Sequence, residues 1–164
     1  MQRHKHTIAL LGALQPAGKQ IAMAACPVYT LLLADDNRKE LELLQQSLKT
    51  QYPDAIAELT DCAETAAWEA DIIVITTTAG HQPSMAVKIE RFSTRKTVIQ
   101  VKAPGEKFVS LRQSLPHAKL ASVQMEKEIA WIDGEDEEAV MTAAVLMDLC
   151  GLLPVCKQHS TNTK

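Results

Sequence analysis

Residues 7–37 constrain the fold of this chain more than any other stretch. They contain an apolar segment (7–11), a glycine turn (12–18), a helix of small residues (19–26), a second apolar segment (29–34) and two acidic residues, Asp35 and Asp36. This order is typical of a βαβ unit in which a strand turns sharply into a helix. The helix N-terminus of such a unit lies where a pyrophosphate would bind, and its acidic residues lie near a ribose.

The rest of the chain alternates between segments with strand and helix patterns. The β-branched run 71–76 lacks polar alternation, which indicates a strand buried on both faces. Further strands are expected at 55–59, 97–101, 119–125, 129–132 and 152–156. Helices are expected at 37–51 with Asn37 as N-cap, at 61–68 capped by Thr60 or Asp61, at 84–92, and at 135–150 ending at Gly151. The pattern predicts one α/β domain, residues 1–156, with a doubly wound, mostly parallel, Rossmann-like sheet, and a polar tail at 157–164.

Composition narrows the class of protein. With 46% hydrophobic residues the chain is expected to be globular. A net charge of −3 without a long basic run argues against nucleic acid as a partner. No segment is apolar enough to span a membrane, and the N-terminus is a poor secretory signal, so we expect a cytoplasmic protein. The four cysteines, Cys26, Cys62, Cys150 and Cys156, lack metal-ligand spacing, and we expect each to pack as a small hydrophobic residue.

The glycine turn keeps part of a dinucleotide-binding pattern. Gly12 is placed to permit the tight turn, and Gly18 to let the helix pack closely on the strand. Leu14 or Gln15 occupies the position where a glycine usually lets the backbone approach phosphate, and either side chain would crowd a pyrophosphate. Pro16 suits the first helical turn but removes one N–H group. Two interpretations stay open: a phosphate-binding turn, or a tight turn with no ligand.

The two aspartates follow Gly12 at the interval expected for a ribose-binding carboxylate. Asp35 or Asp36 could accept hydrogen bonds from a ribose 2′-hydroxyl, and would repel a 2′-phosphate, which favours NAD over NADP. Arg38 and Lys39 argue the other way, because either could bind a phosphate. The alternative is that these residues are a solvated strand end and a helix cap.

A polar loop follows the 71–76 strand and is expected to lie beside the glycine turn, at the carboxyl edge of the sheet. Thr76, Thr77 and Thr78 offer hydroxyl groups there, and Gly80 offers close backbone approach. His81 is a weak catalytic candidate because its imidazole could titrate near neutral pH. The alternative is an exposed loop histidine. The catalytic residues are otherwise unknown, and no metal ligands are expected.

Scattered motifs in a familiar order support a family resemblance. They are residues 7–36, 71–78 and 97–104, the segment Gly134-Glu135-Asp136-Glu137-Glu138-Ala139, and the segment Gly151-Leu152-Leu153-Pro154-Val155. The chain resembles the NADP-binding domain of deazaflavin-coenzyme-dependent NADP oxidoreductases. That family opens its first helix with G-x-x-G-x-x-G, starts a late helix with G-D/E-D-x-E-A and ends it with G-x-x-P-V. The resemblance implies hydride transfer between a nicotinamide and a deazaflavin or flavin partner.

Three positions depart from the family pattern. Gln15 replaces the middle glycine, Asp35 and Asp36 stand where NADP enzymes carry hydroxyl or basic residues, and Thr77 and Thr78 replace an apolar-proline pair. Residues 12–18 are also similar to the G-A-T-G-x-x-G turn of atypical short-chain dehydrogenases of the redox-sensing type, some of which bind a dinucleotide without turning it over.

Two functions are therefore expected from the sequence. The first is an NAD(P)-binding oxidoreductase. Its expected cofactor-binding residues are Gly12, Leu14, Gln15 and Gly18, together with Asp35, Asp36, Arg38, Thr76, Thr77 and Thr78. The second is a non-catalytic binding or regulatory module with a degenerate site. A homodimer is expected because a lone nucleotide-binding domain leaves one side of its cleft uncovered.

Overall fold

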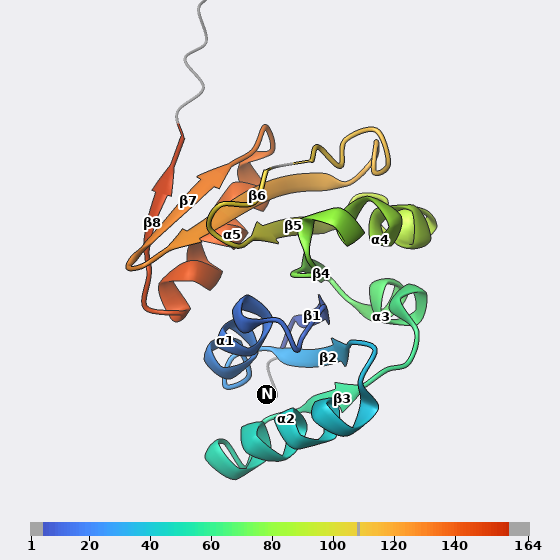
Figure 1. Cartoon of the computed structure of the whole chain (residues 1–164), viewed down its shortest axis with the longest axis vertical. Coiled ribbons are helices and arrows are strands. Elements are labelled where there is room, and N and C mark those ends of the chain that lie inside the picture. Colours follow the sequence, from blue (N-terminus) through green and yellow to red (C-terminus); the bar gives the residue numbers. More distant parts are fainter. Residues whose placement is uncertain (1–4, 108, 158–164) are drawn as a thin grey trace, which may run out of the picture.

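The computed structural model describes residues 5–107 and 109–157, which form an eight-stranded sheet with helices on both faces (Figure 1). The strands are β1 (Thr7–Leu11), β2 (Thr30–Ala34), β3 (Ala57–Leu59), β4 (Ile72–Ile75), β5 (Thr97–Lys102), β6 (Lys119–Glu126), β7 (Ile129–Asp133) and β8 (Leu153–Cys156). The helices are α1 (Pro16–Ala25), α2 (Arg38–Gln51), α3 (Ala63–Glu69), α4 (Gln82–Ile89) and α5 (Glu137–Leu149), with short 3-10 turns η1 (Ala79–His81) and η2 (Glu90–Phe92) flanking α4. Within these ranges, no helix combines the length and apolar character needed to cross a bilayer.

The strand order is β3-β2-β1-β4-β5-β6-β7-β8, and every neighbouring pair is parallel except β6 and β7. The chain winds outward from β1 to β3, then crosses back and continues on the other side of β1 with β4. The order reverses between β1 and β4, which is where ligands bind in open α/β sheets. The prediction of a doubly wound, mostly parallel, Rossmann-like sheet is confirmed.

Each face of the sheet carries its own apolar core. Ile8 and Leu10 of β1 pack on one face with the buried sides of α1, α2 and α5. Ala9 and Leu11 pack on the other face with α3, α4 and the segment that connects β5 to β6. All four residues of β4 are buried, as the unbroken apolar run predicted. The centre of the sheet is therefore packed on both faces.

The start of α3 corrects the sequence prediction, which placed its N-cap at Thr60 or Asp61. The N-cap is Cys62, and it makes no side-chain cap hydrogen bond. The Thr60 hydroxyl is instead 3.3 Å from the Cys62 nitrogen, outside the helix, and Asp61 pairs with Arg38. The cap at Asn37 is confirmed, since its side chain accepts a 3.1 Å hydrogen bond from the Glu40 nitrogen.

The structure describes the end of α5 but only the first residue of the expected C-terminal tail. Gly151 ends α5 with a φ of +78°, a conformation that glycine adopts readily, so the predicted helix stop is confirmed. Of the expected tail at 157–164, residues 158–164 lie outside the described residues.

Candidate functional site

The turn between β1 and α1 needs both of its glycines. Gly12 has a φ of +94°, and a Cβ atom there would lie 2.6 Å from the backbone nitrogen of Thr77. A Cβ atom on Gly18 would lie 2.5 Å from the carbonyl oxygen of Gly12. These distances are shorter than real Cβ contacts, so β4 and α1 close on the turn only because the two side chains are absent. The predicted structural roles of the first and last glycine are confirmed.

Most backbone N–H groups of this turn already donate hydrogen bonds within the protein. The Leu14 N–H donates to Asp35 Oδ2 over 3.0 Å, and the Gln15 N–H donates to the Gly12 carbonyl over 3.1 Å. Pro16, the first residue of α1, has no N–H to offer. What remains in the first helical turn is the amide of Ala17 and that of the buried Gly18. A phosphate at this helix end would meet fewer backbone donors than a glycine-rich turn supplies.

Asp35 holds the turn in place. Its two carboxylate oxygens accept from the backbone of Leu14 and, over 2.7 Å, from the backbone of Asp36. The carboxylate that follows β2 therefore bridges the ends of β1 and β2. Asp36 is exposed beside it, and its carboxylate makes no hydrogen bond with the described residues. Of the two predicted ribose ligands, Asp36 has the freer carboxylate.

Two pockets open on either side of the turn. The β2 pocket, about 420 Å³, lies beyond β2 and β3 and includes Gly12, Asp35 and Asp36. The β5 pocket, about 240 Å³, lies beyond β4 and β5 and includes Pro16, Thr76 and Lys102. Three residues line both pockets: Gln15, Thr77 and Thr78. The two pockets therefore adjoin at this shared wall beside the β1–α1 turn, and together we call them the groove.

The β2 pocket is acidic. Four carboxylate residues line it, namely Asp35, Asp36, Asp61 and Glu64, against one lysine, Lys88. Glu64 accepts a 3.0 Å hydrogen bond from the Cys62 thiol, which lowers the pKa of this carboxyl group and keeps it ionised at neutral pH. The lining suits hydroxyl groups that donate hydrogen bonds and disfavours an additional phosphate.

Arg38 does not line this pocket, although its partner Asp61 does. Its guanidinium lies 2.7 Å from Asp61 and 3.5 Å from Glu42, and these partners raise the pKa of the arginine. These two ion pairs occupy Nη1 and Nε of the guanidinium, so the predicted phosphate-binding role for Arg38 would compete with them. Lys39 is likewise absent from the lining.

The β4 loop carries the predicted hydroxyl groups, but they have different surroundings. The Thr76 hydroxyl is buried and lies 2.7 Å from the Gly12 carbonyl, so it supports the turn. The Thr78 hydroxyl is 2.6 Å from Nδ1 of His81. Thr77 Oγ1 is closed off from solvent and, alone among the buried side-chain polar atoms of the described residues, has no hydrogen-bond partner. A buried hydroxyl without a partner costs about 1–3 kcal/mol.

His81 is an exposed residue of η1 and lines only the β2 pocket. The other pocket therefore has no histidine beside it. The bond to Thr78 fixes the imidazole at the edge of the acidic pocket.

A buried pair of glutamines positions the β4 loop, and sequence reasoning missed it. Gln82 Nε2 donates to the carbonyls of Thr77 and Val101 over 2.9 and 2.8 Å. Gln100 Nε2 donates to Gln82 Oε1 over 2.6 Å and to the Val109 carbonyl over 2.9 Å. Gln82 and Gln100 are 0% and 6% exposed. This ladder ties the loops after β4 and β5 together and so fixes one wall of the β5 pocket.

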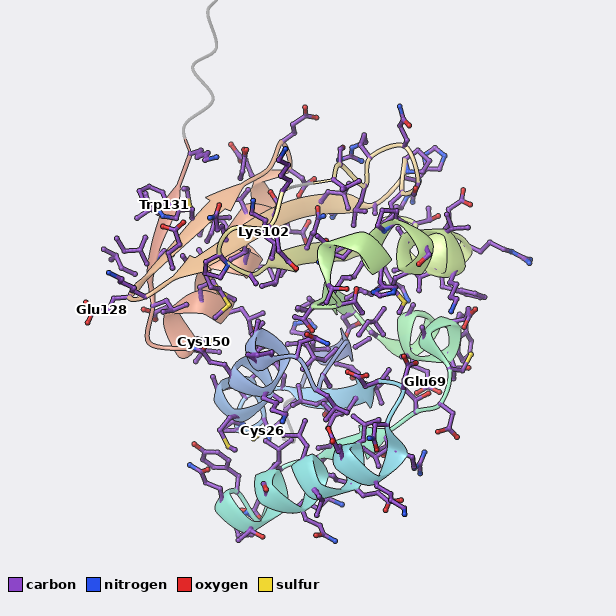
Figure 2. The ribbon with its side chains drawn as sticks, in the orientation of Figure 1. Cys26, Glu69, Lys102, Glu128, Trp131 and Cys150 are labelled. Carbon is purple, nitrogen blue, oxygen red and sulfur yellow. The ribbon has the colours of Figure 1, made fainter. Side chains whose placement is uncertain are left out.

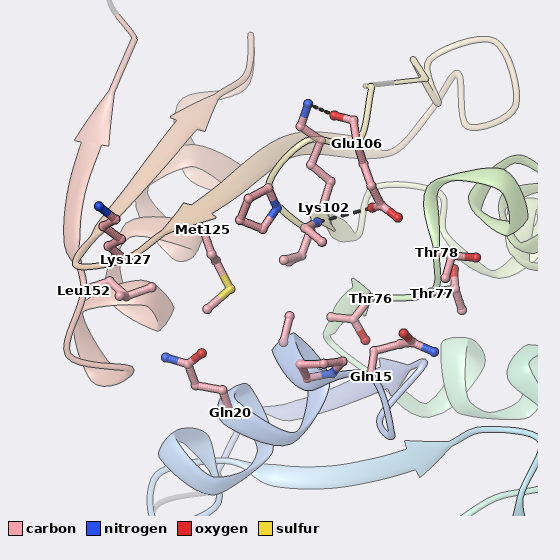
Figure 3. Close-up of a pocket in the computed structure, with 15 residues that line it drawn as sticks. Gln15, Gln20, Thr76, Thr77, Thr78, Lys102, Glu106, Met125, Lys127 and Leu152 are labelled. Atoms are coloured by element: carbon pink, nitrogen blue, oxygen red, sulfur yellow. Dashed lines mark hydrogen bonds between the residues drawn. The ribbon is translucent and has the colours of Figure 1, made fainter.

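Charged residues line the β5 pocket, but most of its interior is apolar (Figure 3). The Lys102 amine points away from Gln15 and Gln20 and donates to the backbone carbonyl of Glu106. The Glu106 carboxylate accepts from the Ala103 nitrogen over 3.3 Å. Met125 and Leu152 face the space beside Thr76. The pocket can hold a flat, mostly apolar group. Its charged lining residues are Lys102, Glu106 and Lys127, and the first two are bonded to backbone atoms of the pocket wall.

The cysteine prediction is correct for Cys26 and Cys150, which pack in or against the apolar core, and wrong for Cys62 and Cys156. Cys26 is buried at the end of α1, and Cys150 is partly buried at the end of α5, where burial raises the pKa of its thiol to about 11 (Figure 2). Cys62 and Cys156 are exposed, in contrast to the expected packing. Their positions at a helix cap and on the edge strand β8 explain this, since neither side chain has a core to enter.

No family model and no curated protein matches this sequence. Solved structures match well. The chain is similar to a pyrroline-5-carboxylate reductase from Coxiella burnetii, with a TM-score of 0.76, 10% identity, and coverage of 96% of this chain and 60% of that one. It is similar to a Plasmodium falciparum pyrroline carboxylate reductase with NADP bound (TM-score 0.66, 14% identity, coverage 96% and 59%).

A putative F420-dependent NADP-reductase from an Arthrobacter species is similar as well, with a TM-score of 0.69, 15% identity, and coverage of 92% of this chain and 84% of that one. This chain spans only 60% and 59% of the length of the two pyrroline carboxylate reductases. At these identities the likeness shows the fold, and the sequence resemblance to an NADP-binding domain is confirmed at that level. The protein has the Rossmann-like α/β fold that it shares with these reductases.

Proposed function

We propose that this protein binds a nicotinamide dinucleotide across the β1–α1 turn and serves as an oxidoreductase-type domain. The observation that carries the proposal is the groove itself. Two pockets flank the turn at the reversal of strand order and share the wall formed by Gln15, Thr77 and Thr78. A two-part ligand joined by an anionic bridge matches that arrangement.

Each half of the ligand has a preferred pocket. Asp36 and the polar lining of the β2 pocket would accept hydrogen bonds from the adenosine ribose. The segment from Gly12 to Gly18 would meet the diphosphate. The mostly apolar β5 pocket, with Thr76 and Met125, would hold the nicotinamide and shield it from water. The bound cofactor supplies hydride transfer, and a deazaflavin or flavin is the proposed second redox partner.

We further propose a preference for NAD over NADP. The four carboxylates of the β2 pocket repel a 2′-phosphate, and Arg38 is already paired with Asp61 and Glu42. The similar Plasmodium reductase has NADP bound, so this preference would distinguish the present chain from it.

A binding module without catalysis is the second candidate. It is favoured by the Leu14 and Gln15 amides, which are already bonded within the turn, and by Pro16. It is also favoured by the bonds that hold Lys102 and Glu106 to the wall of the β5 pocket. A homodimer remains part of either proposal, and light scattering of the purified protein would measure its mass.

Titration with NAD, NADH, NADP and NADPH tests the proposal, followed by thermal melting and by calorimetry. A ligand at 100 times its dissociation constant adds about 2.7 kcal/mol of stability, which a melting curve detects easily. We expect NAD or NADH to raise the melting temperature most. No response to any of the four would remove the proposed function. Binding without turnover of a deazaflavin or flavin partner would favour the second candidate.

A further inference from the structure

The centre of the groove has fewer backbone donors than a glycine-rich turn supplies, since only the amides of Ala17 and Gly18 remain. The Leu14 and Gln15 amides are bonded within the turn, and Pro16 has none. An anion placed there must find other hydrogen-bond donors, because an uncompensated charge at this edge of the sheet is unfavourable. The chain supplies such donors from side chains.

Gln15 and Thr77 are those side chains. Both line the two pockets, so they stand where the halves of the ligand meet. In Figure 3 the Gln15 side chain extends from the start of α1 toward Thr77 and Thr78. Its carboxamide makes no hydrogen bond with any described residue, and Thr77 Oγ1 is buried without a partner. Thr78 differs, because its hydroxyl is already bonded to His81.

We propose that the Gln15 carboxamide and the Thr77 hydroxyl bind the diphosphate bridge in place of backbone amides. This inference rests on the proposed function. The carboxamide donates through Nε2. The Thr77 hydroxyl, which is closed off from solvent in the free protein, donates through Oγ1 once its side chain turns toward the ligand, and so gains the partner that it lacks. Gln15 is then a ligand contact, and its side chain replaces what a glycine turn provides through its backbone.

The inference reverses the usual expectation for residue 15. A glycine there would remove the crowding side chain and restore the family pattern, yet Gln15→Gly would weaken NAD binding. Each hydrogen bond lost to a charged group should cost about tenfold in affinity. Gln15→Ala and Thr77→Val should therefore each raise the dissociation constant for NAD about tenfold, with adenosine affinity unchanged.

Calorimetry with NAD, together with ligand-observed NMR for the weaker adenosine, measures both affinities on the full chain. Gln46→Ala is the matched control, because Gln46 is an exposed glutamine on α2 outside both pockets. The inference is supported if the Gln15 and Thr77 variants lose NAD affinity selectively and the control does not. It is overturned if wild type binds NAD while Gln15→Ala and Gln15→Gly bind it equally or more tightly. If wild type binds no dinucleotide, the proposed function fails and the inference falls with it.

Discussion

The two ends of the groove differ in chemistry, although they share a wall and lie at the same edge of one sheet. The β2 pocket has four carboxylates around a polar space, whereas the β5 pocket is largely apolar and turns its Lys102 amine away from the centre. The β2 pocket can discriminate between ligands by their charge. The β5 pocket can hold and shield a flat group but offers little for proton transfer. If the proposed function holds, the comparison teaches that ligand selection and redox chemistry occur in different pockets, and the redox step comes from bound cofactors.

The largest effect should come from the turn that both pockets share. Gly18→Ala places a Cβ atom 2.5 Å from the Gly12 carbonyl, so α1 must move away from β1. We expect a loss of about 3 kcal/mol in the free energy of unfolding, measured by urea denaturation. Gly80→Ala is the control, since no heavy atom lies within 4 Å of its added Cβ atom, and it should change stability by less than about 0.5 kcal/mol. Equal effects at the two sites would contradict the packing described for the turn.

The glutamine ladder should matter for stability and more for the β5 pocket than for the β2 pocket, because it also holds the Val101 carbonyl of the β5 pocket. Gln82→Leu leaves the Thr77 and Val101 carbonyls without their donor and should cost about 2 kcal/mol in the free energy of unfolding. Because the ladder fixes a wall of the β5 pocket, affinity for NAD should fall while affinity for adenosine is retained. Parallel loss of both affinities would mean that the two pockets are not independent.

Thiol labelling can test which pocket holds the adenosine half. Cys62 lines the β2 pocket, and Cys156 is exposed on β8 outside both pockets. NAD at ten times its dissociation constant should slow alkylation of Cys62 about tenfold, as read by mass spectrometry of the peptides. Cys156 is the internal control and should react at an unchanged rate. Unprotected Cys62 in a protein that binds NAD would place the adenosine elsewhere.

The smallest effect should come from a single charge at the acidic end. Asp36→Asn removes one exposed carboxylate and should shift the NAD-to-NADP affinity ratio about threefold toward NADP. The shift should shrink at high salt, because exposed charges are screened. Asp54→Asn changes an exposed carboxylate outside both pockets and serves as the control. An unchanged ratio in Asp36→Asn would make Asp36 an ordinary surface residue.

The sequence predicted most of the fold because the strong signals are local. The unbroken run of β4 and the Asn37 cap depend on neighbours in the chain, and both are confirmed. The antiparallel pairing of β6 and β7 was not predicted, because a short turn at Lys127, with a φ of +49°, decides it. The α3 cap was missed because Asp61 is drawn to Arg38, 23 residues earlier.

The candidate site was less predictable, since its contacts join distant residues. That Asp35 would bond the Leu14 amide, 21 residues away, could not be read from the spacing that suggested a ribose ligand. Gln82 and Gln100 are 18 residues apart and follow no periodic pattern. The crowding predicted at Leu14 does not occur, because the Leu14 side chain packs against the core. Of Leu14 and Gln15, only Gln15 lines the two pockets. A polar residue inside an apolar strand, as Gln100 is, was the one available signal.

A crystal structure of the protein with NAD tests the central claim most directly. The account predicts one dinucleotide spanning the β1–α1 turn, with adenosine beside Asp36, nicotinamide beside Met125, and the diphosphate within hydrogen-bond distance of Gln15 and Thr77. Electron density for NAD away from the turn, or confined to one pocket with the Gln15 side chain closing the way to the other, would contradict it.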